Sequence, residues 1–120
     1  MRAHSRAVIA FIAGRLISGK NSGSVYDFAA GSHRNISGEV SPESIRVYDH
    51  GRSCHIGGDS NGQRLSLCDY GDSAHLTLEI DGSTFKGYDF GTSGHFSGRV
   101  TGNSISLYDY AAGSHYSYSV

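Results

Sequence analysis

VYDFAAGSH at residues 25–33 recurs four more times along the chain, as VYDHGRSCH at 47–55, LCDYGDSAH at 67–75, GYDFGTSGH at 87–95 and LYDYAAGSH at 107–115. Each copy places a histidine six residues after an aspartate, and successive aspartates are 22, 20, 20 and 20 residues apart. A fixed period in this range is typical of a stacked array of equal structural units. The repeat therefore predicts one array that extends over most of the chain.

The residues between these segments alternate between apolar and polar side chains. In SISLYDY at 104–110, Ile105 and Leu107 share a face with Asp109, and in HFSGRV at 95–100, Phe96 and Val100 share a face. Strict alternation of this kind predicts β-strands. Each unit therefore contains two short strands and two turns. One turn runs from Asp to His, and the other is expected at Asn61-Gly62, Asp81-Gly82 and Thr101-Gly102, where glycine allows a positive φ.

Two all-β architectures satisfy this pattern. We favour a β-solenoid of about five 20-residue strand–turn–strand repeats, in which equivalent strands stack in parallel about 4.8 Å apart. A solenoid encloses its apolar face between its own two sheets. The alternative is an antiparallel β-hairpin meander with Leu78 opposite Phe85, which would have to close into a barrel or gain a second layer to bury that face.

The first 23 residues lack the repeat, so we divide the chain into an N-terminal cap at 1–23 and a tandem β-repeat domain at 24–120. The cap is expected to be either a degenerate repeat or a short helix with Val8, Ile12 and Leu16 on one face. Its apolar run at 7–13 is too short to span a membrane, and no convincing signal peptide precedes the array. Extracellular and cytoplasmic locations both remain open.

The composition restricts the classes of function. The chain has 120 residues, 38% of them hydrophobic and 18% charged, with a formal net charge of −1. Such a balance predicts no nucleic-acid partner. Cys54 and Cys68 match no metal-binding spacing and are expected to be free thiols. Every unit carries the same residues and no catalytic motif stands out, so we predict that the protein is not an enzyme.

The units resemble a known class of repeats. SIRVYDHG at 44–51 resembles a curlin-type amyloid repeat in full, and SISLYD at 104–109 resembles it up to the glycine. This resemblance implies a β-solenoid that self-associates. The chain departs from the curlin pattern by placing aspartate where that family has an amide. A fainter similarity to YD-type (Rhs-like) β-hairpin repeats comes from the Tyr-Asp pairs and the Asp-Gly turn.

The repeated aspartates and histidines are first expected to shape the turns. Each aspartate can accept N–H bonds from residues two or more positions later. Each histidine is predicted to face outward at the start of the second strand, where it can hydrogen-bond an aspartate across the turn. No cofactor is required, but carboxylates and imidazoles in columns suit zinc or calcium. The candidate metal ligands are Asp27, Asp49, Asp69, Asp89, Asp109, His33, His55, His75, His95 and His115.

Aromatic residues flank the aspartates and are predicted to face outward. They form a candidate association surface of Tyr26, Phe28, Tyr48, Tyr70, Tyr88, Phe90, Tyr108 and Tyr110. Exposed rings of this kind suit contacts with protein or sugar. The first functional hypothesis is a structural protein that self-associates into oligomers or fibres, helped by an unpaired edge at the C-terminal HYSYSV. The second is a metal- or carbohydrate-binding module.

Overall fold

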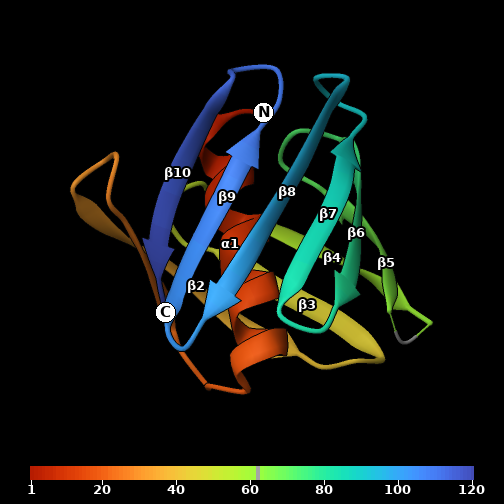
Figure 1. The fold of residues 1–120 in the computed structure, drawn as a ribbon. Helices are drawn as coiled ribbons and strands as arrows, with labels where there is room; N and C mark the ends of the chain where they lie inside the picture. Colours follow the sequence, from red (N-terminus) through yellow and green to blue (C-terminus); the bar gives the residue numbers. More distant parts are fainter. Residues whose placement is uncertain (62) are drawn as a thin grey trace.

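The computed structural model describes residues 1–61 and 63–120 and shows one helix inside a closed barrel of ten antiparallel strands (Figure 1). The helix is α1 (Ala3–Ser18). The strands are β1 (Ser24–Asp27), β2 (Ser32–Val40), β3 (Ser44–Asp49), β4 (Cys54–Ser60), β5 (Arg64–Asp69), β6 (Ala74–Asp81), β7 (Thr84–Asp89), β8 (Gly94–Thr101), β9 (Ser104–Asp109) and β10 (Ser114–Ser119). Each strand pairs with the next along the chain, and β10 pairs with β1 to close the barrel.

The expected solenoid is wrong, and the hairpin alternative describes the fold. Equivalent strands such as β5 and β7 do not stack, because β6 lies between them and pairs antiparallel with both. Equivalent aspartates are therefore about two strand spacings apart, or roughly 10 Å. Both turns of each unit are too short to carry the chain to a second sheet, so each turn forms a hairpin within the same sheet. The edge expected at HYSYSV is closed in part, since Tyr118 and Ser119 pair with Asp27 and Tyr26 of β1.

The second turn of the third and fourth units differs by one residue from the expected position. Asp81 pairs with Thr84, so Gly82 and Ser83 form the tip, and Ile80 rather than Leu78 lies opposite Phe85. Gly82 has a φ of +60°, which fits the first central position of a type II′ turn. Gly102 occupies the same position with a φ of +59°. The expected turn at Asn61-Gly62 includes residue 62, which lies outside the described residues.

Helix α1 fills the interior of the barrel. Residues 7–14 are all buried, so the middle of the helix is apolar on every side rather than along one stripe. A helix of 16 residues is about 24 Å long, which is close to the 28–29 Å extents of the molecule. Eight strands leave an interior that side chains alone can fill, whereas ten strands enclose a wider space. The helix occupies that additional space. Within the described residues, no helix has both the length and the apolar character that crossing a membrane requires.

The inward-facing residues of the strands pack around the helix. Phe11 and Ile12 of α1 are fully buried, as are Leu67 and Leu107 on opposite parts of the wall. At Gly14 the helix backbone lies close to the barrel wall. A Cβ atom at this position would lie 2.9 Å from Cδ1 of Ile105 and 3.2 Å from Cγ1 of Val120. The alternation that predicted the strands thus identifies the barrel wall, and the residues before the array supply the center of the core.

The Asp-to-His turns contain a conformation that is unfavourable for three of their residues. Four residues after each aspartate the backbone is left-handed, with glycine in the outer units (Gly31 and Gly113) but serine in the middle units. Ser53, Ser73 and Ser93 have φ values of 54°, 51° and 56°. A left-handed residue other than glycine is strained by about 1–2 kcal/mol.

We expect Ser73→Gly to raise the free energy of unfolding by about 0.5–1 kcal/mol. The relieved strain exceeds the roughly 0.5–1 kcal/mol that the additional chain entropy of glycine removes. Urea unfolding followed by circular dichroism measures the change as a higher midpoint at an unchanged slope. Gly113→Ser is the matched reverse substitution and should lower stability by a similar amount. A lower midpoint for Ser73→Gly would contradict the expectation.

Candidate functional site

The five repeated aspartates form a ring at one end of the barrel, called here the aspartate ring. Each is the last residue of an odd-numbered strand, and these strands all finish at the end where α1 begins (Figure 1). The carboxylates point inward and are 0–3% exposed. The members are Asp27, Asp49, Asp69, Asp89 and Asp109. Carboxylates near the N-terminus of a helix interact favourably with the partial positive charge of its free N–H groups.

Backbone N–H groups satisfy one oxygen of every carboxylate in the ring. Oδ1 of each aspartate accepts a hydrogen bond from the residue two positions later, and the five N···O distances lie between 2.8 and 3.1 Å. In four of the five turns it also accepts one from the residue three positions later, at 3.1–3.4 Å. The expectation that the aspartates accept N–H bonds within their turns is confirmed.

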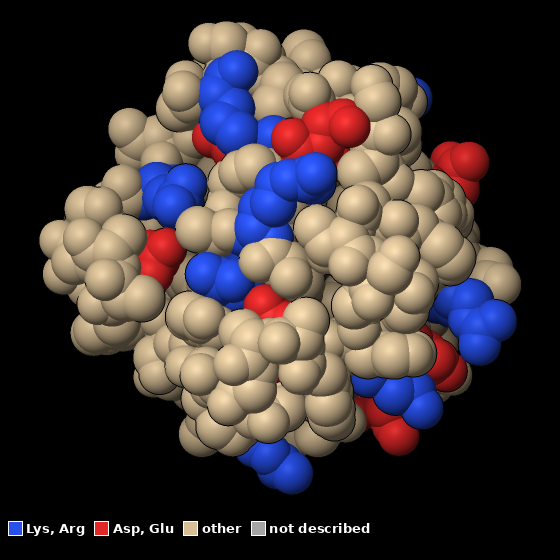
Figure 2. Space-filling view, turned by 90° about the horizontal axis from the view of Figure 1, so that it is seen from above, with Lys and Arg blue, Asp and Glu red and all other residues tan. Residues whose placement is uncertain are grey.

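Basic groups bind the second carboxylate oxygen of four of the five aspartates, and the Thr92 hydroxyl donates to that of Asp89 at 3.0 Å. Arg52 bridges two members of the ring, with Nε 2.8 Å from Oδ2 of Asp49 and Nη2 2.7 Å from Oδ2 of Asp69. Asp109 Oδ2 lies 3.2 Å from both the Met1 ammonium and Nη1 of Arg6. Figure 2, viewed onto this end, shows basic side chains gathered near the center with carboxylates between them. The negative charges of the aspartate ring are therefore largely balanced by basic groups at this end of the barrel.

The pKa values in this network follow from burial and from the paired charges. Burial raises the pKa of Asp109, but the hydrogen bond and charge of the Met1 ammonium and contributions from Ala112 and Arg6 outweigh it, so the pKa lies below its ordinary value. Burial acts on Asp72 in the same way and is outweighed by His4, Arg52 and Arg2, which lower its pKa. Both carboxylates stay ionised in the folded protein at pH values where the unfolded chain begins to take up protons.

We expect the protein to lose stability when the pH falls below about 4. The folded pKa values of Asp72 and Asp109 lie below the unfolded value of about 3.9, so their contribution is present above that value and is lost as the pH falls through the folded pKa. Urea unfolding between pH 6 and pH 3 measures this dependence. Asp72→Asn should reduce its slope, and a stability unchanged down to pH 3 would contradict the assignment.

The repeated histidines lie on the outside of the barrel, on the face opposite to the aspartates. His55, for example, pairs in register with Tyr48, whereas Asp49 pairs with Cys54. His55 packs edge-on against Tyr48 with ring centroids 4.7 Å apart, and His95 packs on Tyr88 at 4.6 Å. The expectation that each histidine bonds an aspartate across the turn is therefore wrong, because alternate residues of a strand point to opposite faces.

The candidate metal ligands are consequently not brought together as repeated Asp–His pairs. Among residues 1–61 and 63–120, one group of three metal-ligating side chains has its ligand atoms within 4.8 Å of one another, and it consists of His4, Asp69 and Asp72. Of the ten candidate ligands, this group contains only Asp69. Arg52 binds both of its carboxylates, and His4 Nε2 lies 2.6 Å from Oδ2 of Asp72. Protein cations therefore already occupy the oxygens that a metal would need.

The predicted association surface forms a band of rings around this end of the barrel, called here the aromatic belt. Phe28, Tyr70, Phe90 and Tyr110 each follow an aspartate and are 56–66% exposed. In three of these units the exposed ring packs on the tyrosine before the aspartate, with centroids 4.7–4.8 Å apart. The belt comprises Tyr26, Phe28, His33, Tyr48, His50, His55, Tyr70, His75, Tyr88, Phe90, His95, Tyr108, Tyr110 and His115.

Sequence reasoning missed the basic groups that compensate the ring. The available signal was Arg52 at the third position of its turn, together with Arg2 and Arg6 near the start of the chain. These residues are far apart in sequence, and 103 positions separate Arg6 from Asp109. Their meeting could be expected only once α1 was known to lie inside the barrel with its first turn at the aspartate ring.

Comparison of the chain with protein-family models, curated proteins and solved structures found no match.

Proposed function

We propose that this protein is a non-enzymatic, self-associating protein whose copies contact one another through the aromatic belt. The observation that carries the proposal is the exposure of four large aromatic side chains, Phe28, Tyr70, Phe90 and Tyr110, at equivalent positions around one end of the barrel. Exposed apolar surface that is concentrated in one region of a protein is typical of an interaction site. Aromatic residues are enriched at such interfaces.

The belt has properties that favour contact. Its rings are already ordered by packing against one another, as in the Tyr108–Tyr110 pair at 4.8 Å, so little side-chain freedom is lost on binding. The turns beside the exposed rings contain small residues such as Ala29, Gly71 and Ala111. These small residues allow a partner to approach the ring faces closely.

Closure of the barrel decides how association occurs. Within residues 1–61 and 63–120 the sheet closes on itself, with β1 and β10 joined by two residue pairs, so little strand edge is available to extend the sheet into another copy. Contacts must therefore be made by side chains. The belt presents nearly the same surface in each unit, which favours a second copy of the chain because equivalent rings can pack on one another across a symmetric interface.

The hydrogen bonds and ion pairs of the aspartate ring argue against a catalytic role for its carboxylates. Turn N–H groups bond every one of its carboxylates, and Arg52, Arg6, Arg34 or the Met1 ammonium bind four of the five. Carboxylates that are buried and bonded in this way have no free position for a substrate. The repeated residues thus support the shape of the turns that present the belt.

The test is the molar mass in solution. Size-exclusion chromatography with light scattering over a range of concentrations should give a mass above the 12.8 kDa of one chain. The variant Phe28→Ser/Tyr70→Ser/Phe90→Ser/Tyr110→Ser should be monomeric at the same concentrations. Arg46→Ser/Asn103→Ser, at exposed positions outside the belt, is the control and should assemble as the unmodified protein does. A protein that is monomeric throughout, or a belt variant that still assembles, would overturn the proposal.

A further inference from the structure

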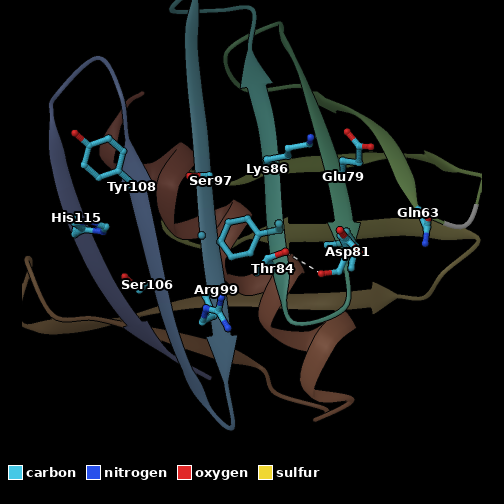
Figure 3. Close-up of a pocket in the computed structure, with 13 residues that line it drawn as sticks. Gln63, Glu79, Asp81, Thr84, Lys86, Ser97, Arg99, Ser106, Tyr108 and His115 are labelled. Atoms are coloured by element: carbon cyan, nitrogen blue, oxygen red, sulfur yellow. Dashed lines mark hydrogen bonds between the residues drawn. The ribbon is translucent and has the colours of Figure 1, made fainter.

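A groove crosses the outside of the barrel from β6 to β10, and its β10 end reaches Tyr108 and His115 of the aromatic belt. Its volume is about 730 Å³, within the range of roughly 300–1,000 Å³ that is usual for small-ligand sites. It crosses about four interstrand spacings, or roughly 19 Å. The close-up in Figure 3 shows its polar side chains arising from five neighbouring strands and the loop before β5.

The shape of the groove follows from small residues in its middle. Ser97 on β8 and Ser106 on β9 line it where larger outward side chains would fill it. Beneath them Gly98 has no side chain, and a Cβ atom there would meet the ring of Phe85 and the carbonyl oxygen of Ser106. The strands thus come close together at this point, and the Phe85 ring forms part of the floor.

The charges in the groove are unevenly distributed. Glu79 and Asp81 lie at the β6 end, and Glu79 is paired with Arg64 at 3.7 Å. Lys86 and Arg99 lie nearer the center, and within the described part of the chain neither side chain makes a hydrogen bond or an ion pair. Lys86 lies opposite Glu79 in register. In register, the residues opposite Arg99 are Thr84 and Ser106, which are uncharged. An exposed guanidinium without a carboxylate partner is suited to bind an anionic group.

The other end of the groove offers an aromatic ring and polar side chains. Tyr108 pairs with Ser97 on one side and with His115 on the other, and all three line the groove. Sugar rings stack on tyrosine faces while their hydroxyl groups exchange hydrogen bonds with serine and histidine side chains. A second hollow shares Glu79, Lys86 and Ser97 with the groove and continues over Tyr88 and Tyr110.

We propose that this groove binds an acidic oligosaccharide. Arg99, assisted by Lys86, binds a carboxylate of the sugar chain, and the adjoining rings lie along Ser97 and Ser106 and stack on Tyr108. Glu79 and Asp81 repel the anionic chain from the β6 end, so the chain extends toward β10. The groove shares Tyr108 and His115 with the aromatic belt, whereas its anion-binding residues Arg99 and Lys86 lie outside the belt.

Isothermal titration calorimetry with hexagalacturonate tests the proposal. We expect saturable binding that weakens with added salt, whereas neutral cellohexaose and inorganic phosphate bind at least about tenfold more weakly. Arg99→Gln should weaken binding by about tenfold or more, as expected for loss of a charged hydrogen bond. Arg46→Gln on the opposite wall is the matched control and should leave binding unchanged.

Several outcomes would overturn the assignment. No binding of hexagalacturonate, equal binding of cellohexaose, or an equal loss in the Arg99→Gln and Arg46→Gln proteins would each contradict an acidic-sugar site in the groove. Binding of phosphate as tight as that of hexagalacturonate would show an anion site without sugar recognition. Tyr108→Ala provides a second variant, and unchanged affinity there would remove the stacking contact. Thermal unfolding of each variant checks that the barrel is intact.

Discussion

Replacing Phe11 by alanine is expected to lower the free energy of unfolding by about 3–5 kcal/mol. The Phe11 side chain is fully buried near the middle of α1. Deleting a large aromatic side chain from a packed core removes its transfer free energy and leaves a cavity. Inside a closed barrel the wall cannot collapse freely into the space, because each strand is held by hydrogen bonds on both sides.

Urea unfolding measures this effect, with Leu16→Ala as the control. Leu16 belongs to the same helix but is only partly buried near its C-terminal end. Its substitution should therefore destabilise the protein clearly less, by about 1–2 kcal/mol. Equal losses in the two variants, or a loss below about 1 kcal/mol for Phe11→Ala, would show that the helix does not form the center of the core.

Replacing Arg52 by methionine is expected to cost about 3–5 kcal/mol. Its guanidinium binds Asp49 and Asp69, whose side chains are only 4% and 2% exposed. Removing one partner of a buried ion pair leaves charge without compensation, and here two carboxylates lose the same cation. The pKa of Arg52 shows how strongly the site favours the charged guanidinium. Burial lowers this pKa, but hydrogen bonds to Asp69 and Asp49 and the charge of Asp69 raise it above its ordinary value.

The control is Arg64→Met, which removes an arginine whose side chain is 68% exposed and lies 3.7 Å from Glu79. That exposed pair should contribute no more than about 1 kcal/mol. The deficit of Arg52→Met should shrink on acidification, because protonation neutralises the two carboxylates that it leaves unpaired. Urea unfolding at pH 7 and pH 4 measures both effects. A deficit that is independent of pH would point to lost packing rather than unpaired charge.

The turns and the strands could be predicted because their causes are local. Alternation around Ile105 and Leu107 identified an inward face, and both side chains are buried. The role of Asp109 also followed from nearby residues, since its N–H donors lie two and three positions later. A carboxylate and its own turn are adjacent in sequence, so their interaction does not depend on the rest of the fold.

The histidines show where local reasoning was insufficient. The sequence placed His55 and Asp49 at the two ends of one turn, and a short turn suggested that they meet. The register instead pairs Asp49 with Cys54, which places His55 one residue further along on the opposite face. Alternation had already predicted that the histidines face outward, and the register agrees with it. The expected Asp–His hydrogen bond was wrong because side chains on opposite faces of a sheet cannot meet across a short turn.

The groove was also beyond prediction from the repeat. Lys86, Arg99 and Tyr108 come from three successive strands and share no motif. Alternation along each strand predicts that these side chains point outward. That they lie close together in space depends on the pairing of β7 with β8 and of β8 with β9. Arg99 lacks an ion-pair partner among the described residues because the register places uncharged Thr84 and Ser106 beside it.

By itself the sequence determined a repeating strand–turn–strand unit, the inward face of each strand and the aspartate that shapes each turn. These features arise from interactions between residues that are close in sequence. The same interactions recur in every unit of about 20 residues. Only the tertiary structure decided between a solenoid and a barrel. Both architectures use the same strands, and the difference depends on how the apolar face is covered. Helix α1, which carries no repeat, covers it from inside, and ten strands can close around it because their interior is wide enough to hold a helix.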